Sequence, residues 1–256
     1  MIGNVIVGQS GGPTSVINAS LVGVYKTALD MGAGKIYGMI NGMYGFLDEK
    51  YVNLKDCIQN DLKIELLKRT PSSYLGSCRF KLPDYNIDEE PYIKAFNLLK
   101  KLDIKHFFYI GGNDSMDTLS KMGAYGRKIG SDIRFVGVPK TIENDLEGTD
   151  HTPGFGSAAK YIGSVMKEVI RDNKVYGSDL IAVVEIMGRN AGWLAAASAL
   201  SKAEDCEGPE MILLPEITFD PEKFLNETVQ RHKEKKAFVI AVSEGIMTKD
   251  GNTYAK

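Results

Sequence analysis

The stretch Lys105 to Thr118, KHFFYIGGNDSMDT, limits the fold of this chain more than any other. Its run of aromatic and branched residues is typical of a strand that is covered on both faces, as in a parallel sheet. The run stops at Gly111 and Gly112, which lack a Cβ and can therefore adopt positive φ and let a ligand come close to the backbone. We predict a buried strand, a glycine turn, and a helix start whose free amides favour an anion.

The same residues also fit a turn with a purely structural role. Asn113 or Asp114 would then cap the helix, because a short polar side chain can accept hydrogen bonds from the free amides of a first turn. This stretch alone does not decide between an anion site and a capped turn.

The alternation of strand, glycine turn and helix recurs in the first part of the chain. Residues 2–8 predict a strand that ends in GQSGGPT, and the apolar residues of 17–28 have the spacing of a helix. Further strands are expected over 35–40 and 133–138, whereas 41–84 is irregular. This rhythm predicts an α/β fold with a parallel sheet, in which the turns at the carboxyl ends of the strands face one cleft.

A second series of the same kind follows residue 154, so we expect two lobes, 1–154 and 155–256. Gly154 to Ser157 are expected to form a hinge. Pro91 is expected to open a helix in the first lobe. The elements expected in the second lobe are helices over 158–169, from Trp193 and over 221–236, and strands over 180–186, 211–214 and 237–242.

The composition fits a soluble protein of the cytoplasm. Apolar residues make up 43% of the 256 residues and the net charge is −2, so no global basic field points to nucleic acid or to a membrane as a partner. The three cysteines include no CxxC pair, which argues against a zinc site or a disulfide framework and for a reducing compartment. No leader is recognisable, and no apolar run approaches the roughly 18 residues of a membrane span.

Charged and hydroxyl side chains gather directly after the strand expected over 133–138. PKTIEND places Lys140, Thr141, Glu143 and Asp145 within six positions, a combination that suits phosphoryl chemistry but also a network of caps in a loop. Arg79 in LGSCR, Arg189 in MGR and Glu244 after the last expected strand could bind a phosphorylated sugar or be ordinary surface charges.

Six motifs occur in the order and spacing of the phosphofructokinase family, which the chain resembles from Val5 to Glu244: SGGPTSVINA, LGSCR, IGGNDS, PKTIEND, MGRNAGW and VSEG. The resemblance implies two lobes of Rossmann-like αβα architecture, with the phosphoryl donor bound by 1–154 and the sugar phosphate by 155–256. It implies transfer of a phosphoryl group to the 1-hydroxyl of fructose 6-phosphate, Mg²⁺ as the cofactor, and a homo-oligomer, either a dimer or a tetramer.

The resemblance also assigns a role to each matching residue. The donor is bound by Gly11, Gly12, Arg79, Asp114 and Ser115, and the metal by Asn113 and Asp114. Glu143 is the catalytic base and is assisted by Lys140 and Arg189. The sugar phosphate is bound by Thr141, Asp145, Met187, Gly188, Arg189 and Glu244. These roles agree with a reaction that depends on positioning and on neutralisation of charge.

Three departures from the family pattern carry information. Glu143 stands where the family usually has aspartate, and the extra methylene moves the carboxylate by about an ångström, which predicts reduced turnover. The chain ends before the family's later histidine and arginine motif for the sugar 6-phosphate, so the second lobe is expected to be short at its C-terminal side. Asn113 stands where many relatives have a metal-binding aspartate, a change that fits pyrophosphate-dependent members.

The donor is predicted to be pyrophosphate. In members that use ATP, the positions of Asp114 and Lys140 are usually glycine, and a carboxylate at position 114 should repel the α-phosphate of a nucleotide. Three alternatives remain from the sequence: an ATP-dependent 6-phosphofructokinase, a non-catalytic or regulatory member that binds sugar phosphate, and an unrelated GGD-type kinase of nicotinamide nucleotide or lipid. The MGR and VSEG turns count against the last of these.

Overall fold

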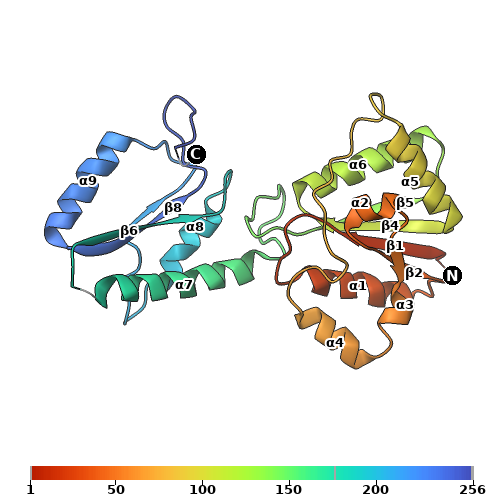
Figure 1. The fold of residues 1–256 in the computed structure, drawn as a ribbon, viewed down its shortest axis with the longest axis horizontal. Helices are drawn as coiled ribbons and strands as arrows, with labels where there is room; N and C mark the ends of the chain where they lie inside the picture. Colours follow the sequence, from red (N-terminus) through yellow and green to blue (C-terminus); the bar gives the residue numbers. More distant parts are fainter. Residues whose placement is uncertain (1, 176, 255–256) are drawn as a thin grey trace. The chain divides into compact units, whose positions relative to one another are not determined.

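Two sheets organise the chain, one in each half (Figure 1). The computed structural model describes residues 2–175 and 177–254, and the chain divides into the units Met1–Thr141 and Ile142–Lys256. Both units are built from strands and helices in alternation, so the predicted α/β class is confirmed. The expected boundary after residue 154 lies inside the second unit.

The sheet of the first unit has the strand order β3-β2-β1-β4-β5. Its strands are β1 (Asn4–Gln9), β2 (Ile36–Met39), β3 (Tyr51–Asn53), β4 (Ile104–Gly111) and β5 (Arg134–Pro139). All neighbouring pairs are parallel except β2 and β3, which are antiparallel. The carboxyl ends of β1, β2, β4 and β5 therefore lie along the same edge of the sheet, as the sequence predicted.

Helices cover both faces of this sheet, with α1 on one side and α5 and α6 on the other (Figure 1). The helices are α1 (Ile17–Asp30), α2 (Gly42–Leu47), α3 (Leu54–Cys57), α4 (Asp61–Arg69), α5 (Glu90–Lys101) and α6 (Asn113–Lys128). Phe107 and Tyr109 of β4 pack in the core beneath α5, whereas Ile110 packs in the core beneath α1. Burial of each such side chain contributes roughly 1.5 to 3 kcal/mol, so both faces of β4 hold it in place.

The segment 41–84, which the sequence left irregular, contains three helices and the strand β3. The longest, α4, is capped by Asn60, whose side chain accepts a hydrogen bond from Lys63 N at 2.9 Å. It buries only Ile64 and Leu67, too few residues to give a clear helical period. No helix or strand is present over 70–82, and this stretch carries Arg79.

The second unit has a parallel sheet with the order β6-β8-β7. Its elements are α7 (Phe155–Val175), β6 (Leu180–Ile186), α8 (Trp193–Ala197), a 3-10 turn (Ser198–Ser201), β7 (Met211–Leu213), α9 (Pro221–Glu234) and β8 (Ala237–Ser243). These bounds confirm the predicted series to within a few residues at most ends, although α7 extends further than expected at both of its ends. The predicted hinge is wrong, because α7 already begins at Phe155 and only Gly154, with φ of 117°, precedes it.

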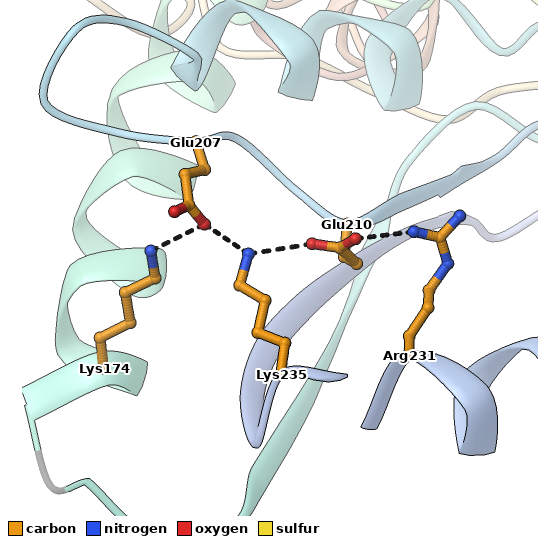
Figure 2. A network of polar contacts seen from close by, with 5 residues as sticks. All are labelled: Lys174, Glu207, Glu210, Arg231 and Lys235. Carbon is orange, nitrogen blue, oxygen red and sulfur yellow. Dashed lines mark hydrogen bonds and ion pairs between the residues drawn. The ribbon is translucent and has the colours of Figure 1, made fainter. Parts of the chain in front are cut away.

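A network of ion pairs joins α7, α9 and the loop before β7 (Figure 2). Glu207 lies 3.0 Å from Lys174 Nζ and also pairs with Lys235, which in turn lies 3.0 Å from Glu210. Arg231 completes the network at 2.6 Å from Glu210. Hydrogen bonds from Lys235 and Lys174 lower the pKa of Glu207 to about 2. The carboxylates are partly solvated, so each pair contributes at most about 1 kcal/mol.

None of the helices in the part of the chain that the structure describes is both long and apolar enough to cross a membrane.

Candidate active site

Lys140 joins three of the strand-end turns of the first unit. It follows β5, its backbone amide donates to Gly111 O at the end of β4, and its ammonium group donates to Gly12 O at 2.7 Å. A Cβ added to Gly11 would lie 3.0 Å from the same ammonium nitrogen. The predicted residues Gly11, Gly12 and Lys140 therefore lie together at the carboxyl edge of the sheet.

The ammonium group of Lys140 is almost completely buried, since only 4% of the residue is exposed. Burial lowers the pKa of Lys140, and the positive charge of Arg79 lowers it further. Among the described residues of the first unit, no carboxylate forms an ion pair with Lys140. A buried cation that feels a second cation is stabilised by a bound anion, so this position favours a phosphate group.

The turn after β1 is fixed to the segment that carries Arg79. Gly11 has φ of 75°, a conformation that favours glycine, and its amide donates to Cys78 O at 3.1 Å. The hydroxyl of Ser77 donates back to Gly11 O. These two bonds hold Arg79 next to the turn, which explains why its charge reaches Lys140.

The turn after β4 needs glycine for a reason other than the predicted one. Neither Gly111 nor Gly112 has positive φ, so that part of the prediction is wrong. A Cβ on Gly111 would lie 2.0 Å from Ser115 Oγ, so close packing excludes a side chain there. The alternative of a side-chain cap is also wrong, because Gly112 is the N-cap and Asn113 and Asp114 lie inside the first turn.

The residues predicted to bind the metal ion are exposed at the start of α6. The carboxylate of Asp114 lies 3.8 Å from Lys81 Nζ, and both side chains are largely solvated. No cluster of three or more metal-binding side chains exists in the described ranges 2–175 and 177–254. Mg²⁺ commonly takes one or two carboxylates and completes its shell with water and substrate phosphates, so Asn113 and Asp114 fit an ion that is shared with the donor. Ser115, by contrast, is buried beneath Gly111.

In the second unit, the side chain of Asn144 fixes the turn that carries Glu143. Asn144 has φ of 59°, and its Oδ1 accepts a hydrogen bond from Thr152 N at 2.9 Å. Its Nδ2 donates to Asp150 O at 3.1 Å. This folds TIEND back onto residues 150–152. Asn144 lies within the PKTIEND motif, but the sequence analysis gave it no individual role, although Asn often adopts the left-handed conformation in a turn.

The turns after β6 and β8 are locked together. Ser243 donates to Gly188 O at 2.7 Å, and Gly188 N donates to a carboxylate oxygen of Glu244 at 3.1 Å. A Cβ on Gly245 would lie 1.9 Å from Arg189 O, so only glycine fits at this crossing. Glu244 and Arg189 were predicted, whereas Ser243 and Gly245 were missed because they act on the backbone.

Four of the predicted site residues of the second unit interact through their charges. Burial raises the pKa of Glu143, and the charges of Asp145 and Glu244 raise it further, whereas Arg189 lowers it. Three carboxylates and one guanidinium therefore interact at one end of this unit. A carboxylate with a raised pKa is the stronger proton acceptor, which is what a general base requires. Met187 directly precedes Gly188 in the chain and is half exposed.

Comparison with known proteins agrees with this arrangement. The sequence model of the phosphofructokinase family matches residues 4–256. The chain belongs to the phosphofructokinase family.

Two curated phosphofructokinase relatives carry the same name, pyrophosphate–fructose 6-phosphate 1-phosphotransferase. The protein from Rhodospirillum rubrum is 42% identical over 250 residues, which cover 97% of this chain and 60% of the relative. The protein from Halomonas elongata is 39% identical over 256 residues, which cover 98% of this chain and 61% of the relative.

The same fold is seen in a solved phosphofructokinase. The crystal structure of a pyrophosphate-dependent phosphofructokinase from Nitrosospira multiformis matches with a TM-score of 0.87 and 39% identity, and covers 98% of this chain and 63% of that one. The chain thus spans 60% to 63% of the length of these three relatives.

Proposed function

We propose that the chain forms the donor site and the catalytic turn of a pyrophosphate-dependent phosphofructokinase. The reaction transfers a phosphoryl group from pyrophosphate to the 1-hydroxyl of fructose 6-phosphate and gives fructose 1,6-bisphosphate and phosphate. The observation that carries the proposal is the buried ammonium group of Lys140, which lies at the turn of Gly11 and Gly12 within reach of the charge of Arg79. The names of the relatives from Rhodospirillum rubrum and Halomonas elongata support it.

On the donor side, the chain binds and neutralises pyrophosphate. Lys140 and Arg79 offset the negative charge of the transferred and leaving phosphates, and the turn at Gly11 leaves room for their oxygens. Asp114 lies exposed on the first turn of α6, where its carboxylate repels the α-phosphate of a nucleotide. Pyrophosphate has no such group, so the same residues that accept it exclude ATP.

The metal ion belongs to the donor site in this proposal. Asn113 and Asp114 hold Mg²⁺, which supplies charge neutralisation at the phosphate oxygens. We assign Ser115 to the donor site because its side chain packs against Gly111 and so fixes the turn at which the donor binds.

On the acceptor side, Glu143 takes the proton of the sugar 1-hydroxyl. The raised pKa of Glu143 makes it a better acceptor than an ordinary glutamate, and the charge of Arg189 offsets part of this rise. Thr141 and Asp145 orient the hydroxyl from the same turn. Met187, Gly188, Arg189 and Glu244 bind the sugar phosphate.

The proposal is tested by steady-state turnover with fructose 6-phosphate, Mg²⁺ and either pyrophosphate or ATP. We expect kcat/KM for pyrophosphate to be well above that for ATP. Asp114→Gly should relieve the exclusion of ATP, and Lys140→Gly should mainly remove turnover with pyrophosphate. Asp117→Gly, one turn further along α6, is the matched control. A protein that prefers ATP, or a donor ratio that neither change alters, would show that these residues do not select the donor.

We also propose that the enzyme is a cytoplasmic homo-oligomer, a dimer or a tetramer, with no nucleic-acid or membrane partner. All three cysteines of the chain are free thiols, which suits a reducing compartment. Sedimentation of the purified protein measures the oligomeric state, and a concentration-independent monomer would contradict the proposal.

A further inference from the structure

Two buried amide side chains lie between β1, α1 and the irregular stretch 70–79. Gln9 is the last residue of β1 and Asn18 lies in the first turn of α1, and neither has any exposed surface. Buried amides of this kind are expensive unless all their groups are hydrogen-bonded, so their partners show what they hold in place.

The partners are backbone groups of the irregular stretch. Gln9 Nε2 donates to Asn18 Oδ1 at 2.9 Å, and Gln9 Oε1 accepts from Leu75 N at 2.9 Å. Asn18 Oδ1 also accepts from Tyr74 N at 2.9 Å, and Asn18 Nδ2 donates to Thr70 O at 2.8 Å. We call Gln9 and Asn18 the amide clamp. It fixes one carbonyl and two amides of a segment that has no helix or strand of its own.

The clamped segment leads directly to the donor site. Leu75 is buried, and its carbonyl accepts from Asn41 N at 2.8 Å at the end of β2. Three residues further, Cys78 O accepts from Gly11 N, and Arg79 follows. The position of Arg79 therefore depends on these backbone bonds together with the side-chain bonds made at residues 70–75, and not on a regular element.

We propose that Gln9 and Asn18 are positioning residues for the phosphoryl donor: they hold the segment 70–79 against the β1 turn so that Arg79 reaches the donor phosphates. This inference rests on the proposed function for the role of Arg79. The clamp itself rests on the hydrogen bonds alone. Loss of Gln9 leaves the buried amide of Leu75 without an acceptor, and loss of Asn18 does the same to the partly buried amide of Tyr74. The segment can satisfy these amides only by moving toward water.

Asn4 provides a matched control at the opposite end of the same strand. Its Nδ2 donates to Leu102 O at 2.8 Å and its Oδ1 accepts from Lys35 N at 2.9 Å. It thus makes the same kind of side-chain bonds to two backbone groups, but at the amino edge of the sheet. Asn4→Leu should weaken the first unit in general without moving the segment 70–79.

The first experiment measures hydrogen exchange at the amides of Tyr74 and Leu75. In Gln9→Met and Asn18→Leu these amides should exchange on the order of tenfold faster than in the unchanged protein, and in Asn4→Leu they should not change. Asn18→Asp keeps the oxygen that accepts from Tyr74 N, so it serves as the milder variant if the others do not fold. Unchanged exchange in Gln9→Met or in Asn18→Leu relative to Asn4→Leu would overturn the clamp, and so would exchange at Tyr74 that is as fast in Asn18→Asp as in Asn18→Leu.

The second experiment measures the binding of Mg²⁺-pyrophosphate by calorimetry. Arg79→Ala should weaken binding roughly tenfold or more. Gln9→Met should also weaken binding, because Arg79 then no longer reaches the donor phosphates. The double variant should therefore bind no more weakly than Arg79→Ala alone. Asn4→Leu should bind as the unchanged protein does.

The outcomes separate the two ideas. If Arg79→Ala leaves pyrophosphate binding unchanged, the proposed donor site is wrong, whatever the exchange data show. If Arg79→Ala weakens binding but Gln9→Met does not, or if the two effects add, the positioning role is wrong and the donor site stands.

Discussion

Replacing Lys140 by methionine should raise the stability of the free protein and lower its response to pyrophosphate. The ammonium group is buried, and among the described residues of the first unit its hydrogen-bond partner is Gly12 O. Removal of that bond costs about 1 kcal/mol, whereas relief of a buried charge without a carboxylate partner gains about 1 to 4 kcal/mol. The free energy of unfolding without ligand should therefore stay equal or rise by up to about 3 kcal/mol.

The bound state should change in the opposite direction. At pyrophosphate concentrations of about 100 times the dissociation constant, the unchanged protein gains about 2.7 kcal/mol of stability from the ligand. Loss of one charged hydrogen bond weakens binding by roughly tenfold, which leaves a gain of about 1.4 kcal/mol. Urea unfolding with and without Mg²⁺-pyrophosphate measures both quantities. A Lys140→Met protein that is destabilised by more than about 2 kcal/mol and keeps the full response to pyrophosphate would refute a ligand-binding role for Lys140.

Three further predictions concern carboxylates of the second unit. Glu143→Ser should lower kcat by on the order of a hundredfold and Glu143→Asp should raise it, whereas full activity of Glu143→Ser in a turnover assay would remove it as the base. Asp145 raises the pKa of Glu143, so Asp145→Asn should move the acidic limb of the pH profile of kcat/KM to lower pH; a shift to higher pH would contradict this. Glu207 has a pKa lowered to about 2, so its contribution to stability is present above about pH 4.5 and is lost as the pH falls through 2. Glu207→Gln should therefore cost at most about 1 kcal/mol in urea unfolding at pH 7 and clearly less at pH 2, and an equal cost at both would disprove this.

The strand ends could be predicted from the sequence because glycine and polar residues mark them. The apolar run of β4 stops at Gly111 in the structure as in the sequence, and β6 and β8 likewise end at their predicted turns. Parallel strands then place their turns at one edge without further information. This is why Lys140 and the glycines after β1 were predicted to meet, and they do.

Short helices and backbone-directed side chains could not be predicted in this way. The helices over 42–57 are at most six residues long and have no period to detect. In the sequence, Gln9 lies in a predicted turn and Asn18 at the start of a predicted helix, and neither place indicates burial. Both are fully buried, because their backbone partners lie more than fifty residues away at Thr70 to Leu75. Likewise Ser243 and Gly245 act only on the backbone of the MGR turn, and no pattern within one segment reveals such contacts.

We propose that pyrophosphate binds at the strand-end turns of the first unit. The most direct test of this proposal is amide NMR of the isotope-labelled chain during titration with Mg²⁺-pyrophosphate, and separately with Mg²⁺ and a non-hydrolysable ATP analogue. We expect pyrophosphate to shift the side-chain signal of Lys140 and the amide signals of Gly11, Gly12, Gly112 and Asn113. The ATP analogue should shift the same signals less at equal concentration. Shifts confined to other parts of the chain, or a stronger response to the ATP analogue, would contradict it.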